Sequence, residues 1–238
     1  MSETPLRSRA RLLGFVYLLY FVAAIWGGLL VKGFTVQGDA VATAHNFAVH
    51  QVAVRAASAM GLVSIALYLV LTALFYELFR PVSRRLSLIA TLLSVAACTI
   101  QAFGDVFLAP LQMLAGSQGG FEMEELRSLA QASLAMHTQA LQIALVLFGC
   151  FDLLIGILIV RSGFLPRIFG VLMVLAGFGW LIYLWPPLAD ELSRVVQPLG
   201  FLAEAVLLVW LLAKGVDEER WRALWVKRES RSSRCAEG

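Results

Sequence analysis

The chain contains few charged residues. Aspartate, glutamate, lysine and arginine make up 15% of its 238 residues, and 60% of the residues are hydrophobic. A soluble domain carries about 25% charged residues. Together with a mean hydropathy of +0.80, this deficit excludes an ordinary soluble domain and indicates that the chain lies in lipid.

Cysteine and the common catalytic motifs are also scarce. There are three cysteines: Cys98 and Cys150 lie within apolar runs, and Cys235 lies in the C-terminal tail. The tail is predicted below to lie on the reducing side of the membrane, so we expect no disulfide. The sequence contains no Walker loop, no GxSxG elbow and no glycine-rich dinucleotide loop. Motifs therefore indicate no enzyme class, and we expect no cofactor.

Six apolar runs are long enough to cross a bilayer, for which a helix needs about 20 residues. They lie at residues 11–31, 56–79, 86–110, 135–160, 164–185 and 197–213. Backbone polar groups in lipid must be satisfied within each span, which favours helices. The sequence predicts an all-α, polytopic membrane helix bundle with six transmembrane helices. Residues 1–10 form an N-terminal lead, residues 11–215 the transmembrane domain, and residues 216–238 a basic amphipathic tail.

Lysine and arginine are unevenly distributed between the two predicted sides of the membrane. If both termini are cytoplasmic, only four of the 19 lysines and arginines fall on the outer side, namely Lys32, Arg55, Arg127 and Arg194. This bias follows the positive-inside rule and predicts an inner-membrane protein with both termini inside. The basic tail then faces anionic lipid headgroups, and we expect no nucleic-acid partner.

Three local patterns predict features of the fold. Asp39 is placed to cap a short amphipathic helix within residues 38–54 on the outer surface. Residues 123–136 should extend the fourth span as a helix. Gly149 and Gly156, like Gly170 and Gly177, are seven residues apart, a spacing that permits two helices to approach closely.

Polar side chains form a stripe along the third span. They recur at alternating steps of four and three, which keeps them on one helix face: Ser87, Thr91, Ser94, Cys98, Gln101, Asp105 and Gln112. Polar groups facing lipid would find no partners, so this face should look into the bundle. It is either a polar packing seam or one wall of a ligand-binding cleft.

Ionisable side chains within spans supply the site hypothesis, because such groups are costly in lipid and tend to be functional. The predicted topology puts a set of polar side chains in the outer half of the membrane: Arg55, Gln101, Asp105, His137, Gln142 and Glu204. Arg55 is the expected counter-ion of Asp105 or Glu204. The six could converge on a ligand-binding pocket, or Arg55 and a carboxylate could simply lock two helices together.

Other chemistry stays open at this point. His45, His50 and His137 all fall on the outer side, but His45 and His50 are five residues apart rather than the four that put two imidazoles on one helix face. We therefore predict no metal site, although a metal- or haem-dependent enzyme using His137 remains an alternative. Asp152 stands alone near the inner end of the fourth span, with Thr72 or Tyr76 as its expected partner.

The sequence resembles a bacterial membrane family known as domain of unknown function 4386 (DUF4386). The resemblance runs through nearly the whole chain. Its most specific element is Arg161-Ser162-Gly163-Phe164-Leu165-Pro166-Arg167 with Gly170 following. Further elements are Arg11-Leu12-Leu13-Gly14, Gly38-Asp39-Ala40, Phe79-Arg80-Pro81-Val82, Ala203-Glu204 and Trp210-Leu211-Leu212-Ala213-Lys214-Gly215-Val216. The resemblance implies a multi-span fold with no assigned reaction in a bacterial inner membrane, and it singles out Glu204 for testing.

These observations favour a non-enzymatic membrane protein with an outer-leaflet polar pocket. The expected partners are the lipid bilayer and a lipid, a small molecule, a partner subunit or a second copy of the chain. A metal- or haem-dependent enzyme and a small secondary transporter are the alternatives. A transporter would be expected to contain helices broken near the midplane, whereas these spans read as continuous.

Overall fold

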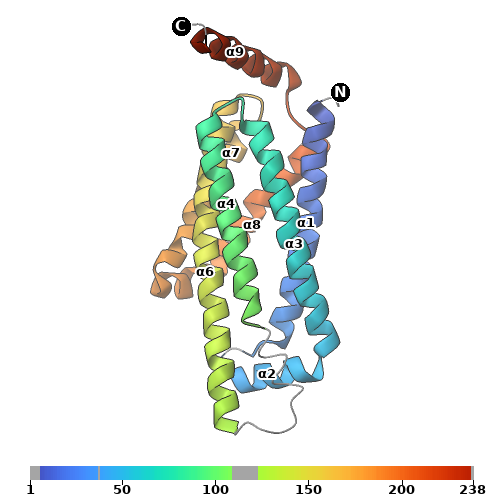
Figure 1. The fold of residues 1–238 in the computed structure, drawn as a ribbon, viewed down its shortest axis with the longest axis vertical. Helices are drawn as coiled ribbons and strands as arrows, with labels where there is room; N and C mark the ends of the chain where they lie inside the picture. The colour runs from blue at the N-terminus through green and yellow to red at the C-terminus, as the bar shows by residue number, and fades with distance from the viewer. Residues whose placement is uncertain (1–5, 37, 109–122, 237–238) are drawn as a thin grey trace. The chain divides into compact units, whose positions relative to one another are not determined.

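The computed structural model describes residues 6–36, 38–108 and 123–236. Within these ranges the chain forms helices and no strand (Figure 1). The elements in chain order are α1 (Leu6–Phe34), α2 (Ala40–Val49), α3 (Gln51–Phe79), α4 (Arg84–Val106), α6 (Met123–Ser162), α7 (Arg167–Trp180), the 3-10 helix η1 (Leu181–Leu184), α8 (Pro186–Ala213) and α9 (Glu218–Ala236).

Six of the helical segments are long and apolar enough to cross a membrane, as the sequence predicted. They are Ala10–Phe34, Gln51–Phe79, Arg84–Val106, Ser128–Ser162, Arg167–Leu184 and Pro186–Ala213. The main difference from prediction is at the sixth span, whose helix begins at Pro186 rather than residue 197 because Pro186 opens it at the first helical position. Residues 109–110 of the predicted third span lie outside the described residues.

The fold divides into two compact units. Unit 1 comprises Met1–Leu18, Leu69–Ala96 and Leu145–Gly238, and unit 2 comprises Leu19–Tyr68 and Ala97–Ala144. Four of the helices contribute residues to both units. Each unit has its own core, and the two are described separately below.

Glycine holds α6 and α7 together in unit 1, as their spacing predicted. A Cβ atom at Gly156 would lie 2.6 Å from the Gly170 carbonyl oxygen, and one at Gly170 would lie 2.7 Å from the Gly156 carbonyl oxygen. Gly149 and Gly177 meet in the same reciprocal way, at 2.9 and 2.7 Å. Because a side chain at any of these positions would meet backbone, the close approach of these two helices requires glycine.

Aromatic rings fill the rest of the unit 1 core. Phe75 on α3 meets Phe151 on α6 edge-on, and it also meets Tyr17 on α1, with ring centroids 6.1 and 6.0 Å apart. Phe79 stacks on Phe164, just after α6. These rings join α1, α3 and α6 around the point where buried polar groups lie.

The tail helix α9 packs on the ends of two spans within unit 1. The Trp221 indole donates to the Leu78 carbonyl at 2.9 Å, and Arg220 donates to the Gly163 carbonyl at 2.9 Å. The Arg80 guanidinium lies 4.6 Å from the centroid of the Trp225 ring. The sequence predicted an amphipathic tail facing lipid headgroups; in the structure this tail is helical, and its tryptophan side chains also contact protein.

Unit 2 contains the short helix α2, which the sequence placed within residues 38–54. Asp39 caps it by accepting a hydrogen bond from the Ala42 amide at 2.9 Å. Phe47 of α2 is buried in a small apolar cluster with Val54, Leu108 and Ala130. This cluster joins α2 to α3, to the end of α4 and to the start of α6. The α6 helix itself begins at Met123, so the predicted helical extension over residues 123–136 is confirmed.

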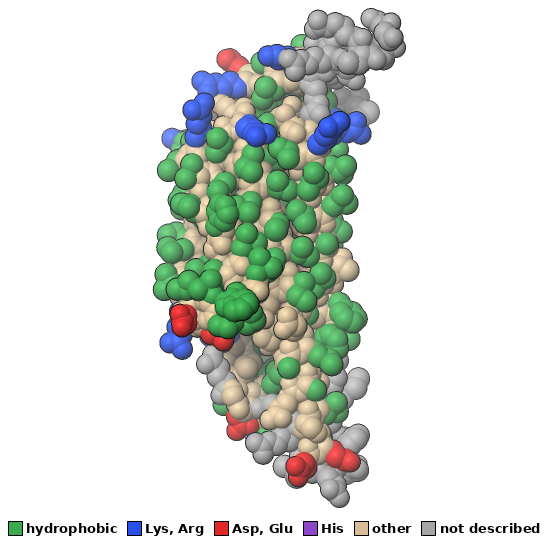
Figure 2. All heavy atoms as spheres, turned by 90° about the vertical axis from the view of Figure 1, so that its left-hand side faces the viewer, with side chains coloured by type: hydrophobic (Ala, Val, Ile, Leu, Met, Phe, Trp, Pro, Cys, Tyr) green, Lys and Arg blue, Asp and Glu red, His purple; other side chains and the backbone are tan. Residues whose placement is uncertain are grey.

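The surface matches a lipid environment. Many large hydrophobic side chains are exposed along the spans, such as Leu29 on α1, Leu92 on α4 and Phe178 on α7. On the face drawn in Figure 2, hydrophobic side chains cover the helix flanks and lysine and arginine side chains gather at helix ends. An exposed apolar surface of this extent is typical of a membrane protein.

Candidate functional site

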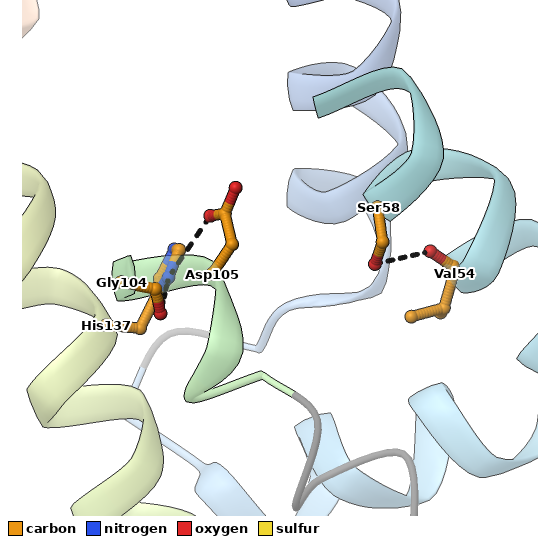
Figure 3. Close-up of polar contacts among 5 residues, drawn as sticks. All are labelled: Val54, Ser58, Gly104, Asp105 and His137. Carbon is orange, nitrogen blue, oxygen red and sulfur yellow. Dashed lines mark hydrogen bonds and ion pairs between the residues drawn. The ribbon is translucent and has the colours of Figure 1, made fainter. Parts of the chain in front are cut away.

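Asp105 and His137 meet in unit 2, as the pocket hypothesis requires of these two residues. Asp105 lies in the last turn of α4, and His137 lies on α6. The Nδ1 atom of His137 is 3.7 Å from Oδ1 of Asp105, and their side chains are 20% and 29% exposed (Figure 3). The pair is therefore half-buried and open on one side.

The backbone fixes the orientation of the imidazole. His137 Nδ1 lies 3.2 Å from the Gly104 carbonyl oxygen. A carbonyl only accepts hydrogen bonds, so in this contact Nδ1 is the donor, and the contact holds the plane of the ring beside Asp105. Gly104 allows this contact because a Cβ atom there would lie 2.8 Å from Ala140 Cβ on α6.

The third wall of this site is α3. A Cβ atom at Gly61 would lie 3.6 Å from Oδ2 of Asp105, an ordinary van der Waals distance that places α3 beside the carboxylate. Ser58 lies one turn before Gly61, and its hydroxyl donates to the Val54 carbonyl at 3.1 Å. Figure 3 shows Ser58 on α3 across from Asp105 and His137.

The other predicted residues of unit 2 are less closely engaged. Gln101 on α4 and Gln142 on α6 are partly buried. Arg55 on α3 is exposed, and among the described residues it forms no ion pair with Asp105. Arg55 is therefore free to face a ligand or a lipid headgroup rather than holding Asp105.

The polar stripe of the third span does face inward. Ser87, Ser94 and Cys98 are buried, and the Ser94 hydroxyl lies 2.6 Å from that of Thr72 on α3. This contact belongs to unit 1 and is the interhelical hydrogen bond expected of a packing seam. Gln112, the last member of the stripe, lies outside the described residues.

Glu204 belongs to unit 1, where its hydrogen-bond partner is Tyr17, a residue that the sequence did not single out. The Tyr17 hydroxyl on α1 donates to Oε2 of Glu204 at 2.9 Å. Glu204 is 6% exposed and Asp152 is 1% exposed. Glu204 and Trp180, at the end of α7, are the neighbours that influence Asp152. Of its expected partners, Thr72 meets Ser94 at 2.6 Å, and the pairing of Asp152 with Thr72 or Tyr76 stays a prediction.

Sequence reasoning missed Tyr17 and Trp180 for a physical reason. Both are aromatic residues in apolar spans, where they read as core packing or as interfacial anchors. A buried tyrosine hydroxyl or indole N–H usually finds a hydrogen-bond partner. That rule predicts a polar partner for each of these two side chains, but it does not identify the partner.

The histidines do not gather. His50 stacks on Phe34 with ring centroids 4.8 Å apart, and His45 is exposed on α2. Within the described part of the chain, no group of three histidine, cysteine, aspartate or glutamate side chains is placed to hold a metal ion.

The fold and its surface define a multi-pass, all-α membrane protein with six spans. Residues 12–215 match a family described as domain of unknown function (DUF4386), and because the match covers most of the chain, the chain belongs to that family. No curated protein and no solved structure matches it significantly.

Proposed function

We propose that this protein binds an aminophospholipid headgroup at the Asp105–His137 site of unit 2. The observation that carries the proposal is the half-buried Asp105 carboxylate beside the His137 imidazole, at the end of a membrane span. A cationic ligand with several N–H donors matches a carboxylate, which only accepts hydrogen bonds. A primary ammonium group has three donors and no acceptor.

Charge on α3 favours a zwitterionic headgroup over a simple cation. Arg55 lies one turn before Ser58 on the helix that forms the third wall of the site, and it is exposed. A guanidinium binds a phosphate through two parallel hydrogen bonds. Phosphatidylethanolamine offers both groups, with the ammonium directed to Asp105 and the phosphate to Arg55. Gln101 and Gln142 are further candidates for polar contacts with the headgroup.

The predicted topology supports the outer leaflet of a bacterial inner membrane as the source of this lipid. Unit 2 contains only three of the chain's 19 basic residues, Lys32, Arg55 and Arg127. The positive-inside rule places such a charge-poor end outside and both termini in the cytoplasm. In this proposal the protein is a binding protein rather than an enzyme.

Native mass spectrometry of the delipidated full-length protein tests the proposal. Phosphatidylethanolamine should bind at least tenfold more tightly than phosphatidylglycerol, which lacks the amine. The Asp105→Asn variant should lose that preference, since an amide does not attract an ammonium ion. The matched control is Asp190→Asn, which removes an exposed carboxylate from α8 and should keep the preference.

Two outcomes would overturn the proposal: equal binding of both lipids by the native protein, or an unchanged preference in Asp105→Asn. Free ethanolamine distinguishes a lipid from a soluble amine as the ligand. If it competes as well as the lipid does, the site recognises a free amine, and the lipid assignment is wrong.

A further inference from the structure

A second pair of ionisable side chains lies in unit 1 and takes no part in the proposed lipid site. Asp152 on α6 and Glu204 on α8 are both buried, and both lie within segments able to span a membrane. Oδ1 of Asp152 is completely enclosed and has no hydrogen-bond partner among the described residues. A buried carboxyl oxygen without a partner is costly and requires an explanation.

In the described part of the chain, no ion pair involves either carboxyl, and Tyr17 donates to Glu204. Trp180 packs against both helices: Cβ atoms at Gly149 and Gly200, one turn before Asp152 and Glu204, would lie 2.8 and 2.7 Å from its side chain. Among the described residues, the ionisable groups recorded against the pair are Tyr17 from α1 and the two carboxyls themselves, while α7 contributes the neutral Trp180.

Two negative charges at this depth would be mutually unfavourable. The effective cost of burying one ion in a protein is several kcal/mol, and two carboxylates that share a site do not both ionise. One shared proton removes one of the charges and provides a donor for the unpartnered oxygen. The Tyr17 hydroxyl, which donates to Glu204, then stabilises the single charge that remains.

The helices around the pair contain irregular geometry. Trp180 is the last residue of α7, and the chain continues as the 3-10 helix η1. A Cβ atom at Gly200 of α8 would lie 2.7 Å from the Trp180 ring, and Pro198 interrupts the α8 hydrogen-bond ladder two residues earlier. A short 3-10 segment and a proline are features of helices that bend, and Trp180 lies where the two meet.

We propose that Asp152 and Glu204 form a proton-binding pair that holds one proton between them inside the membrane and exchanges it with water when the α7–η1 junction moves. The pair lies in unit 1 and uses no residue of the Asp105–His137 site. It can therefore fail or succeed independently of lipid binding.

Infrared spectroscopy of the full-length protein in lipid nanodiscs tests this directly. The native protein should show a protonated-carboxyl C=O band that converts to carboxylate as the pH rises, with one proton released per chain. Asp152→Asn/Glu204→Gln should abolish the band. Glu191→Gln, which changes an exposed carboxyl near the start of α8, should leave it unchanged.

The single variants distinguish sharing from two separate carboxyls. With a shared proton, Asp152→Asn should shift the titration of Glu204, and Glu204→Gln that of Asp152, each by at least tenfold in proton affinity. Independent carboxyls would each lose only their own signal, which would overturn the proposal. Persistence of the native band in the double variant would also overturn it.

Tyr17→Phe keeps both carboxyls and provides a milder test if the amide variants do not fold. Loss of the tyrosine donor disfavours the charged form, so the band should persist to higher pH than in the native protein. An unchanged titration midpoint in Tyr17→Phe would contradict the arrangement.

Discussion

The two units place carboxyl groups in opposite surroundings. In unit 2, Asp105 is half-buried beside an imidazole and is open on one side. In unit 1, Asp152 and Glu204 are enclosed, Glu204 accepts a hydrogen bond from Tyr17, and neither carboxyl forms an ion pair within the described residues. A partly exposed carboxylate such as Asp105 can bind a ligand that arrives from the surface. A buried pair of carboxyls is out of reach of such a ligand and is stabilised instead by a bound proton. The chain thus contains both a partly exposed carboxyl and two buried ones, and the position of each residue within its span does not distinguish them.

The largest effect should come from breaking the helix contact that encloses the unit 1 pair. In Gly156→Ala the new methyl group would meet the Gly170 carbonyl at 2.6 Å, so α6 and α7 must separate. Overpacking of this kind costs about 3 kcal/mol, and thermal unfolding in detergent measures it. Gly28→Ala is the matched control, because nothing lies within 4 Å of a Cβ atom there. It should be neutral or slightly stabilising, and an equal loss in both variants would contradict the close packing.

Removing the enclosed Glu204 carboxyl should reduce the free energy of unfolding by less than Gly156→Ala does. The loss should still be larger than that caused by replacing the partly exposed Asp105. Glu204→Ala deprives the Tyr17 hydroxyl of its acceptor and leaves a small cavity, for a loss of about 2 kcal/mol. Glu204→Gln retains an acceptor and should lose clearly less. Equal stability of Glu204→Ala and the native protein in chemical unfolding would show that the hydrogen bond does not hold α1 to α8.

The polar seam between α3 and α4 in unit 1 should contribute a smaller amount. Thr72→Val removes the hydroxyl that meets Ser94 at 2.6 Å while keeping the side-chain shape. Interhelical hydrogen bonds in membranes average about 0.6 kcal/mol, so the midpoint of unfolding should move only slightly. A double-mutant cycle with Ser94→Ala measures the coupling, and a coupling of zero would mean that the contact is incidental.

The smallest effect on stability should come from the open carboxylate. Asp105→Asn changes a partly exposed group, and such substitutions are usually within about 0.5 kcal/mol. The same variant should nevertheless abolish selective binding of phosphatidylethanolamine. If Asp105→Asn instead unfolds the protein as readily as Glu204→Ala does, the two carboxyl environments are not different in kind.

The sequence predicted the helices well because hydrophobic length is a strong signal in lipid. The six spans, the Asp39 cap, the extension of α6 to Met123 and the glycine contact between α6 and α7 all follow from local composition or spacing. The side of the membrane on which each terminus lies stays a prediction from charge.

The site was harder to predict because it depends on contacts between helices far apart in the chain. Asp105 and His137 were both identified, and they do meet, but Glu204 was grouped with them by depth along its span alone. Its hydrogen bond to Tyr17 joins residues 187 apart in the sequence. No periodicity within a single helix carries that information, and an aromatic residue in an apolar span gives no hint of its polar partner.

The most direct test of the account is to locate bound lipid by photo-crosslinking. A phosphatidylethanolamine carrying a diazirine near its glycerol end would be added to the native protein and to Asp105→Asn, and labelled peptides would be mapped by mass spectrometry. The account predicts labelling concentrated on the unit 2 parts of α3, α4 and α6, and loss of that labelling in Asp105→Asn. Labelling spread evenly over all lipid-facing helices, or unchanged in the variant, would contradict it.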